Sequence, residues 1–121
     1  MARILIVDDS AISRIKLKDI FELDCHEIVG MAEDGLEGVE KFKALKPDLV
    51  TLDVTMPKMK GLDCLKEIMT LDQNANVVMI SALGKGDTIL EALNAGALNY
   101  ITKPFEEKQV LKTIREALEE L

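Results

Sequence analysis

Short apolar runs alternate with amphipathic stretches along the whole chain. Four runs, at residues 3–7, 48–53, 76–81 and 98–102, are rich in β-branched side chains and bounded by turn residues, and a fifth candidate covers 26–31. Runs of this length and composition are typical of fully buried parallel strands. The pattern therefore predicts five strands.

The stretches that follow the strands have the spacing of amphipathic helices. They are predicted to begin near Ser10, Asp34, Gly61, Asp87 and Glu106. Asp34 and Glu37 resemble a capping box, with Asp in place of the usual Ser or Thr. Five strand–helix units with short connections imply a parallel sheet with helices on both faces, which is an α/β fold. At 121 residues, we expect a single domain covering 1–121.

The composition limits the classes of protein to which this chain can belong. A hydrophobic content of 48% excludes disorder, and no apolar run reaches the length of a membrane span, about 18 residues. The chain enters its first strand almost at once, so we expect no signal peptide and a cytoplasmic protein. Cys25 and Cys64 fit no metal or disulfide spacing and are expected to stay reduced. With 15 basic and 22 acidic residues, the net charge of −7 argues against direct nucleic-acid binding but leaves a DNA-binding partner protein open.

Polar side chains follow four of the predicted strands. Asp8 and Asp9 follow the first, Asp53 ends the third, Ser81 ends the fourth and Lys103 follows the fifth. Ligands of open parallel sheets bind beyond the carboxyl ends of the strands, so these groups are expected to meet at one edge. Three adjacent carboxylates repel one another unless a cation lies among them, and Mg²⁺ prefers such oxygen ligands. An Asp can also attack phosphorus, and a lysine can bind a phosphoryl oxygen.

Simpler explanations are open for each of these residues. Asp8 and Asp9 could cap the first helix, Ser81 could be a turn residue, and Lys103 could be a solvated lysine at a strand end. Tyr100 could be an edge-strand aromatic residue that packs on a helix. His26, the single histidine, is predicted to lie on the surface at the start of the second strand.

Taken together, the motifs resemble a response-regulator receiver domain of the CheY-like, single-domain chemotaxis type. The resemblance covers essentially the whole chain. It rests on ILIVDDS at 4–10, LDVTMP at 52–57 with Gly61, ISA at 80–82, AGA at 95–97 and ITKPF at 101–105. It implies a flavodoxin-like, doubly wound sheet of five parallel strands in the order 2-1-3-4-5, with five helices.

The resemblance also implies roles for individual residues. Asp53 would be the phosphoacceptor, and Mg²⁺ would be held by Asp8, Asp9, Asp53 and the backbone carbonyl of Thr55. Ser81 and Lys103 would bind the phosphoryl group, and Ser81 and Tyr100 would form the switch. The bond between Lys103 and Pro104 would be cis. Thr55 and Leu83 depart from the acids and amides that speed dephosphorylation in this family, which predicts a fairly long-lived phosphoryl group.

The resemblance implies signalling by protein contact. A sensor histidine kinase would phosphorylate Asp53, a target protein (the flagellar switch is one candidate) would read it, and a phosphatase could remove it. The chain would not be an enzyme beyond catalysing its own phosphotransfer and dephosphorylation. It could also be a receiver domain cut from a larger regulator. A haloacid-dehalogenase-type phosphatase would need an acid where Thr55 stands. A flavodoxin would need a Ser/Thr/Gly phosphate loop where Asp8 and Asp9 stand.

Overall fold

Five parallel strands form one sheet between two layers of helices. The computed structural model describes residues 1–119 of the chain, and the last two residues lie outside this description. The strands are β1 (Arg3–Val7), β2 (Glu27–Ala32), β3 (Leu49–Leu52), β4 (Val77–Ser81) and β5 (Asn99–Thr102). The helices are α1 (Ala11–Leu23), α2 (Gly35–Leu45), α3 (Gly61–Leu71), α4 (Gly86–Asn94) and α5 (Glu107–Glu119).

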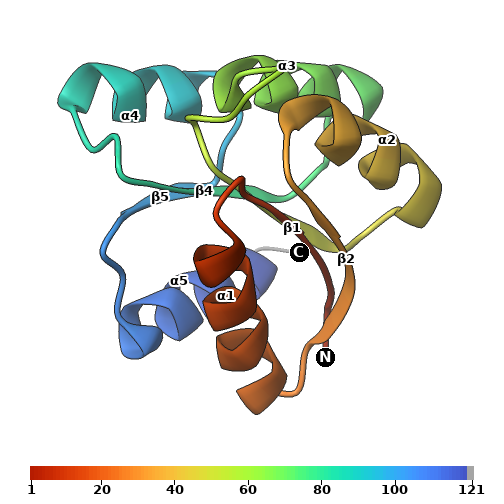
Figure 1. Cartoon of the computed structure of the whole chain (residues 1–121), viewed down its shortest axis with the longest axis vertical. Helices are drawn as coiled ribbons and strands as arrows, with labels where there is room; N and C mark the ends of the chain where they lie inside the picture. The colour runs from red at the N-terminus through yellow and green to blue at the C-terminus, as the bar shows by residue number, and fades with distance from the viewer. Residues whose placement is uncertain (120–121) are drawn as a thin grey trace.

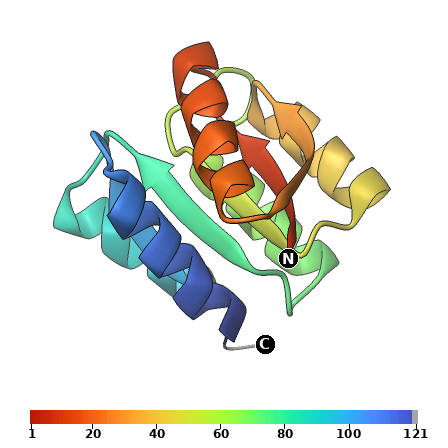
Figure 2. The same cartoon turned by 90° about the horizontal axis from the view of Figure 1, so that it is seen from below.

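The sheet has the order β2-β1-β3-β4-β5, which confirms the expected flavodoxin-like topology. Helices α2, α3 and α4 cover one face, and α1 and α5 cover the other (Figure 1). Figure 2 looks onto the face that α1 and α5 cover. Side chains of β1 alternate between the two cores: Leu5 and Val7 join the α2–α4 side, while Ile4 and Ile6 join the other side. Because both faces are buried, β1 has the near-continuous apolar sequence of a central strand.

The predicted helix starts are confirmed to within one residue. Ser10 caps α1 by accepting a bond from the backbone N–H of Ser13, and Asp34 caps α2 by accepting from that of Glu37. The predicted capping box is only half formed, since the Glu37 carboxylate accepts from the N–H of Glu33 and not from that of Asp34. Of the early N–H groups of α2, that of Glu37 donates to the Asp34 carboxylate and that of Gly38 donates to the Asp34 carbonyl.

The prediction that His26 lies on the surface is wrong. Only 7% of its side chain is exposed. Its ring meets Phe21 edge to face, and its Nδ1 accepts a bond of 3.1 Å from the backbone N–H of Ala2. The ring thus ties the start of β1 to the loop after α1. Within the described residues, Cys25 and Cys64 are both free, and no helix is long and apolar enough to span a membrane.

Candidate functional site

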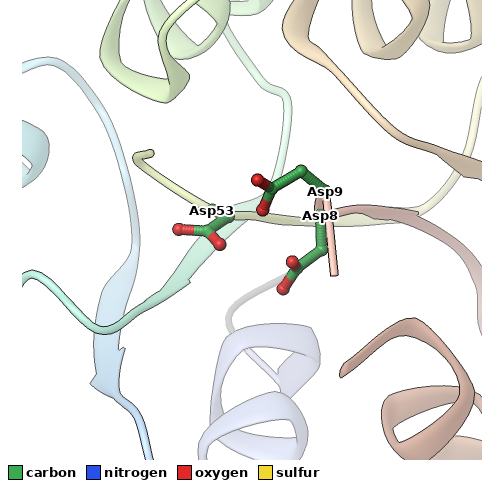
Figure 3. Close-up of side chains that lie close together, drawn as sticks. All are labelled: Asp8, Asp9 and Asp53. Carbon is green, nitrogen blue, oxygen red and sulfur yellow. The ribbon is translucent and has the colours of Figure 1, made fainter. Parts of the chain in front are cut away.

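Three carboxylates meet where two neighbouring strands end. Val7 of β1 pairs with Leu52 of β3, and Asp8, Asp9 and Asp53 follow these two residues directly. Parallel strands that end at the same level therefore place the three side chains together (Figure 3). One carboxylate oxygen from each lies within 4.8 Å of the others. Asp8 and Asp53 are buried, with 1% and 6% exposed, whereas Asp9 is exposed.

Lys103 joins this cluster from the loop after β5. Its ammonium donates to Oδ2 of Asp8 at 2.8 Å and to Oδ2 of Asp53 at 3.1 Å. Only 18% of the lysine side chain is exposed, so the alternative of a solvated lysine is wrong. The peptide bond to Pro104 is cis, as expected from the resemblance.

Backbone groups hold the remaining carboxylate oxygens of the buried pair. Oδ1 of Asp8 accepts from the N–H of Ser10 at 2.9 Å, and Oδ1 of Asp53 accepts from the N–H of Thr55 at 3.2 Å. Each buried carboxylate therefore has one backbone donor and one bond from the shared ammonium. Both side chains are fixed before any ligand arrives.

The electrostatics of the cluster favour an added cation. Burial raises the pKa of the Asp8 carboxyl above its ordinary value, and the nearby charge of Asp53 adds to this, although bonds from Lys103 and Ser10 act in the opposite direction. Burial alone would lower the pKa of Lys103, but its bond to Asp8 and the charge of Asp53 outweigh burial and raise it. One ammonium against three carboxylates leaves negative charge in excess.

The donor set fits a hard divalent cation. Three carboxylates, one of them exposed to solvent, match the oxygen ligands and retained waters that Mg²⁺ prefers. Thr55, the expected backbone ligand, lies in the loop that follows β3, two residues after Asp53. The geometry can therefore hold a cation beside a buried carboxylate and an ammonium, which are the groups that phosphoryl transfer requires.

Ser81 and Tyr100 are linked through the backbone of one residue. The hydroxyl of Ser81, which is fully buried, accepts a 3.3 Å bond from the N–H of Leu83. The Tyr100 hydroxyl donates to the carbonyl of the same Leu83. Burial raises the pKa of the Tyr100 phenol, against a smaller lowering by Ser81. Tyr100 thus makes a polar contact with the loop after β4, which edge-strand packing alone does not describe.

Two residues that the sequence reasoning did not assign to the site also shape it. Arg14 in α1 donates to the backbone carbonyl of Asp8 at 2.6 Å. A Cβ atom at Gly61 would lie 1.9 Å from the carbonyl oxygen of Asp53, so only glycine fits there. Gly61 had a visible signal, a glycine where a helix begins shortly after Asp53. Arg14 had none, because an arginine in a first helical turn is common on solvated surfaces.

Comparison with known proteins identifies the family to which this fold belongs. The family model of the response regulator receiver domain matches residues 4–115. The chain belongs to this family. It is 48% identical to the chemotaxis protein CheY of Thermotoga maritima over 93% of both chains. It is 47% identical to CheY of Bacillus subtilis over 96% of this chain and 97% of that one.

A solved structure supports the same relationship. The crystal structure of a CheX–CheY–BeF3–Mg complex from Borrelia burgdorferi contains a chain 44% identical to this receiver domain, with a TM-score of 0.93. The match covers 94% of this chain and 87% of that one. The receiver domain described here is accordingly a CheY-like phosphoacceptor response regulator, with the acidic cluster of Figure 3 at its sheet edge.

Proposed function

We propose that Asp53 accepts a phosphoryl group in an Mg²⁺-dependent reaction, and that the product switches a protein-binding surface. Residues 1–121 would form one receiver domain. The observation that carries it is the position of Asp53: it is buried at a strand end, bonded to Lys103, and beside two further carboxylates. Asp8 shares these three features, and the assignment to Asp53 instead of Asp8 rests on the resemblance of LDVTMP at 52–57 to the phosphoacceptor segment of the receiver family.

The chemistry follows from the groups around Asp53. A carboxylate oxygen would attack the phosphorus of a phosphohistidine on the kinase, forming an O–P bond while the P–N bond breaks and the leaving imidazole takes up a proton. We assign the metal to Asp8, Asp9, Asp53 and the backbone carbonyl of Thr55. When bound, Mg²⁺ would neutralise charge on the phosphoryl oxygens. Lys103, which now bonds both Asp8 and Asp53, would bond one of these oxygens instead of the Asp53 carboxylate.

The switch would run through Leu83. The Ser81 hydroxyl would turn toward the new phosphoryl group and so release the N–H of Leu83. The loop after β4 would then be free to move, and with it the carbonyl that Tyr100 bonds. Packed cores choose between discrete arrangements, so a small shift at Ser81 can select a second position for Tyr100. The surface affected would be α4, β5 and α5, and we propose this as the output face.

The rival functions have less support. A haloacid-dehalogenase-type phosphatase would need an acid at Thr55, and a flavodoxin would need phosphate-binding groups where Asp8 and Asp9 stand. We therefore propose that the protein turns over no substrate beyond its own phosphoryl group. The family match supports the receiver reading over both.

The partners are proposed from the same relationship. A sensor histidine kinase would donate to Asp53, and a target such as the flagellar switch would bind the phosphorylated form. The CheX–CheY complex of Borrelia burgdorferi supports the idea that a second protein binds a receiver in a phosphoryl-mimic state. Because Thr55 and Leu83 carry no acid or amide, a separate phosphatase would be needed to end the signal. Two free cysteines suit the reducing cytoplasm, where we place this exchange.

Intact-protein mass spectrometry tests the phosphoacceptor directly. The protein is incubated with acetyl phosphate and Mg²⁺, and gain of one phosphoryl group is expected. Asp53→Asn should abolish the gain, and so should a metal chelator. The matched control is Asp63→Asn, which changes an exposed Asp in α3 and should react normally. Phosphate uptake that survives Asp53→Asn or the chelator would refute the proposal.

A further inference from the structure

The contact between Arg14 and Asp8 has a consequence for how the acidic cluster is organised. Asp8 and Asp9 lie just past the last paired residues of β1, where Val7 pairs with Ala32 and Leu52. The N–H of Asp8 still bonds the carbonyl of Ala32. Its own carbonyl lies beyond the ladder, and the guanidinium of Arg14 supplies the donor there.

This contact is close and largely shielded from solvent. Nη1 of Arg14 lies 2.6 Å from the Asp8 carbonyl oxygen, and 13% of the arginine side chain is exposed. The other arm of the guanidinium, Nη2, reaches Oε1 of Glu33 in the loop before α2 at 3.5 Å. Arg14 therefore bridges the loops that follow β1 and β2. A planar guanidinium is suited to hold two acceptors in a fixed relation.

The peptide group that Arg14 holds is the one that leads to Asp9. Asp8 has further restraints, because its carboxylate bonds Ser10 and Lys103. The Asp9 carboxylate is exposed, and no hydrogen bond or ion pair to it occurs among residues 1–119. The backbone alone therefore sets the direction in which the Cα–Cβ bond of Asp9 leaves the chain. We propose that Arg14 is a positioning residue that orients Asp9 for Mg²⁺ binding by fixing the plane of the Asp8–Asp9 peptide bond.

The sign of the effect separates positioning from simple charge. A cation near three carboxylates opposes the binding of a second cation, so loss of the Arg14 charge alone would strengthen Mg²⁺ binding. Loss of positioning would weaken it. Removal of a group that hydrogen-bonds to a metal ligand typically lowers the affinity for the metal about 10-fold or more. The two roles therefore predict opposite changes for the same substitution.

The test is calorimetric titration of Mg²⁺ into the wild type, Arg14→Gln and Arg14→Lys. Positioning predicts that Mg²⁺ affinity falls about 10-fold in Arg14→Gln. It also falls in Arg14→Lys, because a single ammonium cannot replace the fork between Asp8 and Glu33. The matched control is Glu33→Gln, which removes the negative charge beside Nη2 of Arg14 but leaves the bond from Arg14 to Asp8. This variant should bind Mg²⁺ nearly as the wild type does.

Two further readouts distinguish positioning from damage to the fold. Amide shifts of Asp9 and Ser10 in the metal-free protein should change in Arg14→Gln and stay unchanged in Glu33→Gln. Phosphorylation of Arg14→Gln by acetyl phosphate should be slow at low Mg²⁺ and return to the wild-type rate when Mg²⁺ is saturating, because Asp53 and Lys103 are untouched. A misfolded variant would not recover.

The outcomes that overturn the inference are equally specific. Tighter Mg²⁺ binding in Arg14→Gln with normal binding in Arg14→Lys would mean that Arg14 acts by charge alone. Unchanged affinity in both variants would mean that Arg14 does not position Asp9. The inference rests on the proposed metal site, but the two can fail separately. A wild type that binds no Mg²⁺ would refute both the metal site and the role of Arg14. A wild type that binds Mg²⁺ normally, together with variants of unchanged affinity, would refute only the role of Arg14.

Discussion

Helices α3 and α4 lie side by side on the same face of the sheet but are anchored very differently (Figure 1). Helix α3 buries Gly61, Cys64, Leu65 and Ile68, whereas α4 buries only Ala92. The strands differ in the same way. All four residues of β3 are buried, while β5 has one buried residue, Ile101.

This contrast matches the proposed separation of the phosphoacceptor from the output face. Asp53 follows the fully buried β3 and lies beside α3, so its position is fixed by a packed core. Tyr100 lies in β5 beside α4, where Leu90 and Leu93 are 59% and 41% exposed. Regions with few buried apolar contacts open at low free energy, so the α4–β5 region can rearrange without loss of the site.

Truncation of one leucine in each helix should give the largest difference. Leu65→Ala in α3 removes a side chain with 0% exposure and should lower the free energy of unfolding by about 3 kcal/mol. Leu90→Ala in α4 should change it by less than about 0.5 kcal/mol. Urea midpoints measure both. Similar losses in the two variants would mean that α4 is anchored as firmly as α3.

The fold as a whole was predictable from sequence, because buried parallel strands leave a direct record as apolar runs. Strand bounds agree to within about one residue, and Asp8, Asp9, Asp53, Ser81 and Lys103 could be grouped from their places at strand ends. The bonds that link Leu83 to Ser81 and Tyr100 could not be predicted, since Leu83 makes them through its backbone. Arg14 and His26 were also missed, because their contacts depend on where a side chain reaches in three dimensions.

Removal of the shared ammonium should have the next largest effect. Lys103→Met leaves Asp8 and Asp53 buried without their cation and should destabilise the metal-free protein by about 2 kcal/mol. This loss is smaller than the loss expected when one partner of a fully buried ion pair is removed. Mg²⁺ should restore part of the loss by binding the native state. Lys85→Met, at an exposed lysine before α4, is the control. Equal urea midpoints for the two variants would show that Lys103 contributes little to the cluster.

Neutralising Asp8 should act in the opposite direction. Asp8→Asn keeps an acceptor for the Ser10 N–H but removes one of the adjacent charges, so the metal-free fold should gain about 1 kcal/mol. The pKa of Asp8 is raised in the folded state, so the ionised carboxylate lowers the stability of the wild-type fold at neutral pH. The advantage of the variant should therefore shrink as pH falls through that raised pKa and disappear below the ordinary value of 3.8.

The control for this comparison is Asp87→Asn, at an exposed residue in the first turn of α4. Denaturation of the three proteins across the acid range provides the measurement. A lower midpoint for Asp8→Asn at neutral pH would show that the hydrogen bonds of the Asp8 carboxylate outweigh charge repulsion. A stability difference between Asp8→Asn and the wild type that stays constant with pH would show that titration of Asp8 does not cause it.

The smallest effect is expected at the ion pair that joins the two regions. Nζ of Lys66 in α3 lies 3.6 Å from Oε1 of Glu91 in α4, and each side chain is 54% exposed. Lys66→Gln should change global stability by less than about 0.5 kcal/mol. Amide hydrogen exchange should nevertheless accelerate in α4 and stay unchanged in α3. Lys108→Gln in α5 is the control, and equal acceleration in both helices would contradict the contrast between them.

The central claim, that phosphorylation of Asp53 reshapes the α4–β5 region, is tested most directly by amide shift mapping. Spectra are compared before and after addition of acetyl phosphate and Mg²⁺, with Asp53→Asn as the unreactive control. Beyond the loops that carry Asp8, Asp9 and Asp53, we predict that the largest changes fall in residues 83–94 and 99–102, including Tyr100, with little change in α3. Changes confined to the site loops, or larger in α3 than in α4, would contradict the account.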